Sequence, residues 1–313
     1  MCKLAVIIPL YNKESSIVRA IHSVLEQSVD FQQLIIIDDG STDNSLDVAK
    51  QFQDKRISVI SQTNQGVSVA RNKGASIADA DYLCFLDADD QWEPHFLKEI
   101  TTLIHLNKDA SLFCTRYGEI SEEGQYFIGN LVGISQGFRG ELPDFFTAYQ
   151  QNRCLYHPSA SCINVRDFKL IGGFPEEVKI GEDIYAALQL ALSGPVMFSA
   201  NKSSTVFRNA ENRTNVREKF IIPYHVEYFL DPANKDILEK NKTLKSFLLY
   251  NTIIFGLYAA QIGDKKQAFK MAKLLSKQSV MHSIIVFLGA CLPKCFIHLL
   301  KKLRNKKTLS YEN

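Results

Sequence analysis

Short apolar runs and amphipathic segments alternate along the first ninety residues of the chain. The runs are rich in β-branched residues and predict strands over residues 3–8, 33–37, 57–60 and 81–86. The segments between them carry apolar residues at helical spacing and predict helices over residues 14–27, 41–52 and 67–78. Strands that are apolar on both faces and separated by helices are typical of a parallel sheet covered on both sides. The pattern therefore predicts an α/β fold with a doubly wound start.

The pattern becomes less regular in the middle of the chain. Residues 118–140 include six glycines and predict a hairpin or loop, and residues 155–164 predict an extended segment. A helix is predicted from Gly181 to Leu192, where Ser193, Gly194 and Pro195 end it.

The character of the sequence changes beyond about Asp231. Two helical segments over residues 243–262 and 265–277 are joined at Gly263 and Asp264, which predicts an antiparallel helical hairpin. We therefore predict two domains, a core over residues 1–230 and a C-terminal helical extension over residues 231–313.

The end of the chain combines an apolar run with a cluster of positive charge. The run Ile284–Leu292 is followed by six lysines and arginines and no acid between Lys294 and Lys307. A membrane-spanning helix needs about 20 apolar residues, so neither part of this tail spans a bilayer alone. We predict an interfacial helix with its basic residues at the lipid headgroups. The alternative is a core helix followed by a solvated lysine tail.

Composition narrows the class of protein and its compartment. The chain is 46% apolar and 22% charged, which excludes a disordered protein, and its net charge of +2 gives no overall basic field for nucleic acid. Seven cysteines without a CxxC pair indicate a reducing compartment and make zinc a poor candidate. Polar residues interrupt the first apolar run, so we expect no secretion signal and a cytoplasmic location.

Polar loops follow three of the predicted strands. They read Pro9-Leu10-Tyr11-Asn12, Asp38-Asp39-Gly40-Ser41 and Asp87-Ala88-Asp89-Asp90. Ligands of open α/β sheets bind outside the carboxyl ends of the strands, so we expect the three loops to meet at one edge.

The residue types in these loops suit a nucleotide and a cation. Asp87 and Asp89 stand two residues apart and could share Mg²⁺ or Mn²⁺, which would neutralise charge on a departing diphosphate. Tyr11 offers a ring for stacking, Asn12 an amide, and Asp39 an acceptor for a base N–H. The alternative is that these residues are ordinary turn acids, helix caps and a core-edge aromatic.

Taken in order, these motifs resemble the successive blocks of the family 2 glycosyltransferases. Three further blocks carry the resemblance: Gln65-Gly66-Val67-Ser68-Val69-Ala70-Arg71-Asn72-Lys73-Gly74, Ile171-Gly172-Gly173-Phe174-Pro175 and Gly181-Glu182-Asp183. The resemblance covers about residues 3–200. It implies a GT-A fold, which is a Rossmann-like mixed sheet with helices on both faces. It also implies a nucleotide-sugar donor, a divalent metal and inversion at the anomeric carbon.

The resemblance also assigns roles to individual positions. It implies that Tyr11 and Asp39 contact the nucleobase, that Pro9 shapes this pocket beside Asn12, and that Arg71 lies near the nucleotide. In the acidic loop it implies that Asp87 reaches the ribose or the metal, next to Ala88, and that Asp89 ligates the metal. Asp90 is a third candidate ligand. These assignments are expectations for the structure.

Asp183 is the candidate catalytic base. Inverting transfer needs a carboxylate that takes a proton from the acceptor hydroxyl during attack. Its place at the start of a predicted helix favours the ionised form, because the helix dipole stabilises negative charge there. The alternative is that Glu182 and Asp183 are only helix-capping acids.

Four other residues are candidates for structural or binding roles. Trp92, the only tryptophan, is a candidate floor for the sugar pocket or a packing residue. His157 is expected to be structural, and Arg208 and Arg213 are candidates for gripping the diphosphate.

Departures from the family pattern narrow the activity. The chain lacks the Gln-x-x-Arg-Trp motif and the long apolar spans of processive synthases, so it resembles single-sugar transferases instead. We predict a hexosyl- or N-acetylhexosaminyltransferase that moves one sugar from a UDP-type donor, with Mn²⁺ or Mg²⁺, to a glycan acceptor, including a lipid-linked one. Its role would be cell-surface polysaccharide synthesis on the inner face of the membrane, to which the tail would bind. The alternatives are a nucleotidyltransferase, which usually begins with a Gly-rich phosphate loop, and a non-catalytic sugar-nucleotide-binding protein.

Overall fold

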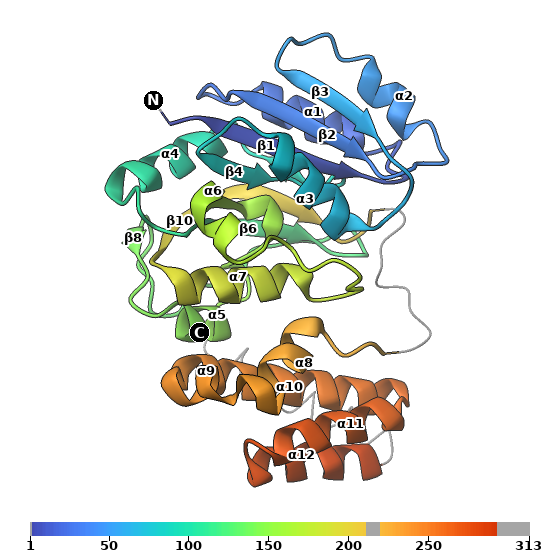
Figure 1. Cartoon of the computed structure of the whole chain (residues 1–313), viewed down its shortest axis with the longest axis vertical. Helices are drawn as coiled ribbons and strands as arrows, with labels where there is room; N and C mark the ends of the chain where they lie inside the picture. The colour runs from blue at the N-terminus through green and yellow to red at the C-terminus, as the bar shows by residue number, and fades with distance from the viewer. Residues whose placement is uncertain (1, 211–219, 293–313) are drawn as a thin grey trace. The chain divides into compact units, whose positions relative to one another are not determined.

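The computed structural model describes residues 2–210 and 220–292 of the chain (Figure 1). The chain divides into two compact units, residues 1–178 with 182–214 and residues 179–181 with 215–313. The first is an α/β unit and the second is helical. Each is described by itself.

A mixed sheet forms the α/β unit. In chain order its strands are β1 (Leu4–Leu10), β2 (Gln33–Asp38), β3 (Ile57–Ser61), β4 (Tyr82–Phe85), β5 (Gln91–Trp92), β6 (Leu112–Ile120), β7 (Tyr126–Phe127), β8 (Arg139–Glu141), β9 (Ser161–Asn164) and β10 (Val196–Phe207). Their order in space is β3-β2-β1-β4-β9-β6-β10-β5, with β7 beside β6 and β8 beside β10.

The predicted parallel start of the sheet is confirmed. Strands β1 to β4 are mutually parallel, and their bounds match the four predicted apolar runs within two residues. Strand β9 then runs antiparallel to both β4 and β6, which makes the sheet mixed. Strand β10 pairs in parallel with β6. The carboxyl ends of β1, β2 and β4 therefore lie at the same edge, as the sequence predicts.

Helices cover both faces of this sheet. They are α1 (Ile17–Leu25), α2 (Ser45–Lys50), α3 (Val67–Ile77), α4 (Phe96–Leu106), α5 (Phe145–Gln151), α6 (Val165–Leu170) and α7 (Glu182–Ser193), with a 3₁₀ turn, η1 (Pro158–Ala160). The main core packs the apolar faces of α1 and α4 against one face of the sheet. On the other face α3 packs on β1 and β2, α6 on β9 and α7 on β6.

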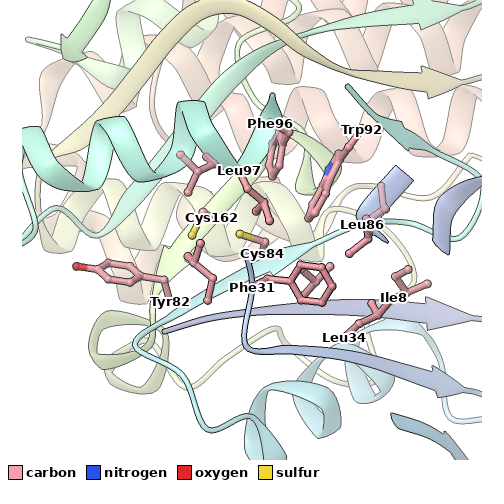
Figure 2. Packing of buried hydrophobic residues seen from close by; sticks show 14 of the residues in the cluster. Ile8, Phe31, Leu34, Tyr82, Cys84, Leu86, Trp92, Phe96, Leu97 and Cys162 are labelled. Atoms are coloured by element: carbon pink, nitrogen blue, oxygen red, sulfur yellow. The ribbon is translucent and has the colours of Figure 1, made fainter. Parts of the chain in front are cut away.

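Alternate residues of the central strands supply the main core, which Figure 2 shows from close by. Ile8, Cys84 and Leu86 point from β1 and the end of β4 toward the aromatic side chains of Trp92 and Phe96. The Trp92 and Phe96 rings stack with their centroids 4.1 Å apart. Burying such aromatic surface is among the largest favourable contributions to folding.

Helix α3 approaches the sheet closely because Gly74 has no side chain. A Cβ atom at this position would lie 2.6 Å from Cγ2 of Ile7. The glycine in this motif therefore brings α3, and with it Arg71, against the buried strand β1.

The second unit is helical, as the sequence predicts. Its helices are α8 (Tyr224–Leu230), the 3₁₀ turn η2 (Pro232–Asn234), α9 (Lys235–Lys240), α10 (Lys242–Ile262), α11 (Lys265–Ser276) and α12 (Val280–Cys291). The predicted hairpin of α10 and α11 is confirmed, and Gly263 ends α10 in the left-handed region with φ of 95°. Helix α12 begins four residues before the predicted apolar run. The basic part of the predicted tail, residues 294–307, lies outside the described residues.

In residues 2–210 and 220–292, no helix combines the length and the apolar character needed to cross a membrane.

Candidate active site at the carboxyl edge of the sheet

Hydrogen bonds join the loops that follow β1 and β2. Asn12 adopts the left-handed region with φ of 49°, which asparagine tolerates better than most residues. Its Oδ1 atom accepts a hydrogen bond of 2.7 Å from the backbone N–H of Thr42, and its own N–H donates to Ser41 Oγ at 3.1 Å. Two of the three predicted loops are therefore held together by Asn12.

The buried carboxylate of Asp39 anchors the loop that leads into α3. It accepts hydrogen bonds from Gln62 Nε2 at 2.8 Å, from the N–H of Gln65 at 2.9 Å and from the N–H of Gly66 at 2.7 Å. Gly66 has φ of 94°, a conformation that favours glycine. A carboxylate has about four acceptor positions, so one remains for a further N–H donor. The ring of Tyr11, in the loop after β1, is 43% exposed.

Two other residues of these loops contribute shape rather than polar groups. Pro9 pairs with Ile37 in the β1–β2 register and is partly buried. The side chain of Ala88 is buried in the main core.

Ser159 holds the acidic loop after β4 in place. Its Oγ atom accepts a hydrogen bond of 3.1 Å from the N–H of Asp87 and donates one to Asp90 Oδ2. The other oxygen of Asp90 accepts from the N–H of Phe207 at 3.1 Å. Ser159 carries no local signal in the sequence, because its partners Asp87 and Asp90 lie about 70 residues away in the chain.

Asp90 is the most deeply buried of the three acids in this loop. Burial, together with the charges of Asp89 and Asp87, raises its pKa well above the usual range. A bound cation would relieve the repulsion among the three carboxylates and favour the ionised form of Asp90.

Three side chains of the described residues could together hold a metal ion. Asp87, Asp90 and His157 place one possible ligand atom each within 4.8 Å of one another. Burial lowers the pKa of His157 to about 3, so its imidazole is neutral and able to act as a ligand. Carboxylate oxygens suit Mg²⁺ or Mn²⁺. The donor set and the repulsion among the three carboxylates thus fit a divalent cation.

Asp89 lies outside this set of three ligand atoms. Its Oδ2 atom is 2.8 Å from Nζ of Lys13, and both side chains are largely buried. A cation shared between Asp87 and Asp89, as the sequence predicts, would compete with this lysine. The assignment of Asp89 to the metal stays a prediction.

Arg71 lies between two acids and is itself 3% exposed. Its Nη2 atom is 2.7 Å from Asp87 Oδ1, and its Nη1 atom is 3.3 Å from Glu182 Oε1. The two carboxylates raise the pKa of the guanidinium further above its usual range, against the effect of burial. The described residues thus give Arg71 carboxylate partners, and the expected contact with the nucleotide stays a prediction.

Asp183 follows Glu182 in the first turn of α7 and is partly buried. Burial and the neighbouring charge of Glu182 raise its pKa to about 7, although Arg71 opposes this shift. Burial and Glu182 therefore outweigh the stabilisation of the ionised form that we expected from the helix N-terminus. A carboxyl group that titrates near neutral pH can both accept and release a proton, which suits a general base.

Arg208 has a buried carboxylate partner. Glu119 accepts hydrogen bonds from Arg208, and from Arg153 Nη2 at 2.8 Å. The two guanidinium groups lower the pKa of Glu119 against the effect of burial. Arg213, the other predicted candidate for the diphosphate, lies outside the described residues.

Trp92 packs in the core. It is 2% exposed, and its Nε1–H donates a hydrogen bond of 2.7 Å to the carbonyl of Ser159. Of the two roles considered from the sequence, the structure supports packing.

Comparisons with known proteins extend these observations. The model of glycosyl transferase family 2 matches residues 5–167, just over half of the chain. An uncharacterized glycosyltransferase of Nostoc sp. is 46% identical over 101 residues, which are 31% of this chain and 31% of the relative. The putative teichuronic acid biosynthesis glycosyltransferase TuaG of Bacillus subtilis is 36% identical over 124 residues, 39% of this chain and 49% of the relative. The matched segments thus span between about a third and a half of the length of these relatives.

The architecture also has a close counterpart among solved structures. The crystal structure of S. aureus TarS 1–349 in complex with UDP-GlcNAc aligns with a TM-score of 0.70 at 18% identity, covering 90% of this chain and 83% of that one. The fold implied by the resemblance is therefore confirmed. The chain belongs to glycosyl transferase family 2, and its mixed α/β sheet is that of a GT-A glycosyltransferase.

Proposed function

We propose that this chain is a metal-dependent inverting glycosyltransferase that moves one sugar from a UDP-type donor to a glycan acceptor. In this proposal Asp183 is the catalytic base, Tyr11 and Asp39 hold the nucleobase with Pro9 and Asn12 beside them, and the acidic loop receives the diphosphate.

One observation carries the proposal. A carboxyl group with a pKa of about 7 follows directly after Glu182, which shares Arg71 with Asp87 of the acidic loop. A general base works best when its pKa lies near the operating pH. The chain thus connects a tuned base to the acidic loop through one buried guanidinium group.

The residues supply the parts of a single displacement. The Asp183 carboxylate takes the proton of an acceptor hydroxyl while its oxygen forms a bond to the anomeric carbon. The bond from this carbon to the diphosphate oxygen breaks on the opposite face, and the diphosphate leaves with the bonding electrons. A divalent cation held by Asp87 with Asp90 and His157, or with Asp89, would neutralise charge on the departing group.

Similar proteins support the donor and acceptor classes in this proposal. TarS 1–349 binds UDP-GlcNAc in its crystal structure, and TuaG is named for teichuronic acid biosynthesis. We therefore infer a UDP-linked hexose or N-acetylhexosamine as donor and a cell-surface polysaccharide as product. A lipid-linked acceptor and a position at the inner membrane face are part of the same proposal.

Donor binding and turnover can be tested separately. The purified chain is heated with Mn²⁺ and each of a panel of UDP- and GDP-sugars, since a ligand that binds the folded state raises the unfolding temperature. UDP release is then measured with the same compounds. We expect a UDP-sugar to stabilise the chain and to be turned over slowly with water as acceptor.

The base is tested with a matched pair of variants. Asp183→Asn should keep donor binding and lose about 10²–10⁴-fold in turnover. Asp236→Asn, which changes an exposed acid in the first turn of α9, should leave both unchanged. Protection by GDP-sugars alone would overturn the donor class, and full turnover by a folded Asp183→Asn variant would overturn the base. Donor binding by the unaltered chain without any turnover would favour a non-catalytic binding protein.

A further inference from the structure

Helix α12 exposes an unusual amount of apolar surface. Only three residues of α12 are buried against the rest of the helical unit, and all three are small: Val286, Gly289 and Ala290. The opposite face carries six large apolar side chains that are each 42–67% exposed: Val280, Met281, Ile284, Ile285, Phe287 and Leu288. Large contiguous apolar surfaces are rare on soluble monomeric proteins, and they commonly mark sites of interaction with a protein or a membrane.

The neighbouring helix α11 carries positive charge. Five lysines lie in and directly after it, and all are exposed: Lys265, Lys266, Lys270, Lys273 and Lys277. Lys270 pairs with Glu227 of α8 at 2.6 Å. Among the described residues, no carboxylate partner is found for Lys266, Lys273 or Lys277.

The charge asymmetry continues along the sequence. Between Asp264 and Glu312 the chain contains eleven lysines and arginines and no aspartate or glutamate. The apolar helix α12 therefore stands in the middle of a long segment whose charges all have one sign.

An aromatic contact joins the two helices on their exposed sides. Phe269 of α11 and Phe287 of α12 are both exposed, and their ring centroids lie 5.4 Å apart. Helical spacing puts Lys266 and Lys273 one turn before and after Phe269. Positive and apolar side chains thus adjoin on one surface, which we call the α11–α12 face. It comprises Lys266, Phe269, Lys273 and Lys277 with the six exposed apolar residues of α12.

We propose that the α11–α12 face docks on an anionic lipid bilayer. Helix α12 has 12 residues and is about 18 Å long, whereas the hydrocarbon core of a bilayer is about 30 Å thick, so the helix lies in the interface. Its apolar side chains enter the acyl boundary, and the lysines of α11 reach the headgroups with their long stems. This inference deepens the membrane position in the proposed function by naming the surface that docks, and vesicle binding tests it separately from sugar transfer.

The positive charge of the α11–α12 face favours a bilayer over a second copy of the chain as its occupant. A twofold contact through this face would bring the lysines of one copy against those of the other, and like charges oppose such a contact. Anionic lipids offer the opposite sign across the whole surface. The lipid surface is therefore the occupant that matches both the apolar and the cationic parts of the face.

Vesicle sedimentation with the full chain tests the docking surface. Vesicles of phosphatidylcholine with about 30% phosphatidylglycerol should bind the chain, and vesicles of phosphatidylcholine alone should bind it far less. High salt should release it, since the attraction to headgroups is screened. The double variant Ile284→Asn/Leu288→Asn should weaken binding at least about tenfold. Lys266→Gln/Lys273→Gln should weaken it about 25-fold, because each lysine near the surface contributes about fivefold.

Matched variants on the α/β unit serve as controls. Leu106→Asn/Leu170→Asn removes two apolar side chains that are 57% and 73% exposed, and Lys98→Gln/Lys169→Gln removes two exposed lysines. Both should bind vesicles like the unaltered chain. Far-UV circular dichroism and turnover of a soluble donor confirm that every variant is folded.

Three outcomes would overturn the proposal. The first is an absence of binding to anionic vesicles by the unaltered chain. The second is unchanged binding by folded variants of the α11–α12 face, which would locate membrane binding elsewhere, for example in residues 294–307. The third is a dimer in light scattering that Ile284→Asn/Leu288→Asn dissociates, which would make a second copy the occupant.

Discussion

Nη2 of Arg71 lies 2.7 Å from Oδ1 of Asp87, and this pair ties α3 to the acidic loop that follows β4. The other terminal nitrogen of the same guanidinium reaches Glu182 at 3.3 Å. One buried cation therefore connects α3, the acidic loop and the start of α7. Arg71 can fix three parts of the site at once because its planar fork presents several N–H donors.

Loss of this guanidinium should destabilise the fold. Arg71→Gln leaves two carboxylates without their shared partner, and removing one member of a buried ion pair costs about 3–5 kcal/mol. We expect a fall of that size in the free energy of unfolding, measured by urea denaturation. Arg166→Gln is the control, because its pair with Asp167 includes a side chain that is 57% exposed and should contribute less than about 1 kcal/mol. Equal losses in the two variants would contradict the bridging role of Arg71.

The first half of the sheet could be predicted because each element is encoded locally. Strands β1, β2 and β4 are short, largely apolar runs, and α1 between the first two has an apolar face. Strands β6 and β10 were not predicted, because they hold buried polar residues such as Thr115, Glu119 and Ser203. Partners from distant parts of the chain satisfy these groups, for example Arg153 and Arg208 for Glu119. Polar residues that are satisfied by such distant partners interrupt the local hydrophobic pattern from which a strand is predicted.

The sequence offers candidate residues for the site but does not give their contacts. Tyr11, Asp39, Asp87 and Asp183 follow recognisable motifs, whereas the partners of Arg71 lie 16 and 111 positions away. Two effects of different size act on the ionisation of Asp183. A helix N-terminus contributes about 0.3–1 kcal/mol, while a pKa of about 7 in place of 3.8 corresponds to roughly 4 kcal/mol. The effect of burial and of Glu182 on the pKa of Asp183 is therefore larger than the effect of the helix N-terminus.

The pKa of Asp183 predicts how activity depends on pH. A general base acts in its ionised form, so kcat/KM should fall about tenfold per pH unit below about pH 7 and level off above it. The measurement is kcat/KM for sugar transfer across about pH 5 to 9, with circular dichroism to show that the fold persists. The residual activity of Asp183→Asn should lack this acidic limb. A limb that persists unchanged in the variant would assign the titration to another group.

The same carboxyl group should limit stability at high pH. Its folded-state pKa lies above its unfolded value of about 3.8, so the folded state loses stability as pH rises from about 4 through 7. Asp183→Asn cannot ionise, so it should gain stability relative to the unaltered chain over this window, by roughly 1–4 kcal/mol at pH 8 and close to zero below pH 4. Urea denaturation at several pH values measures the gain.

The control for this gain is Asp236→Asn, whose acid is exposed in the first turn of α9. Its effect on the free energy of unfolding should be small and nearly independent of pH. A gain for Asp183→Asn that is as large at pH 4 as at pH 8 would contradict the assigned titration.

Removal of one carboxylate should weaken metal binding, which is read from the change that Mn²⁺ causes in each variant. Asp87 belongs both to the pair predicted from the sequence and to the cluster with Asp90 and His157, so Asp87→Asn should weaken Mn²⁺ binding at least about tenfold. Mn²⁺ should raise the unfolding temperature of the unaltered chain, and chelation should reverse this effect. Asp109→Asn changes an acid at the opposite edge of the sheet and should leave the Mn²⁺ effect intact. If Asp87→Asn responded to Mn²⁺ as fully as the Asp109→Asn control, the cation would have to bind elsewhere.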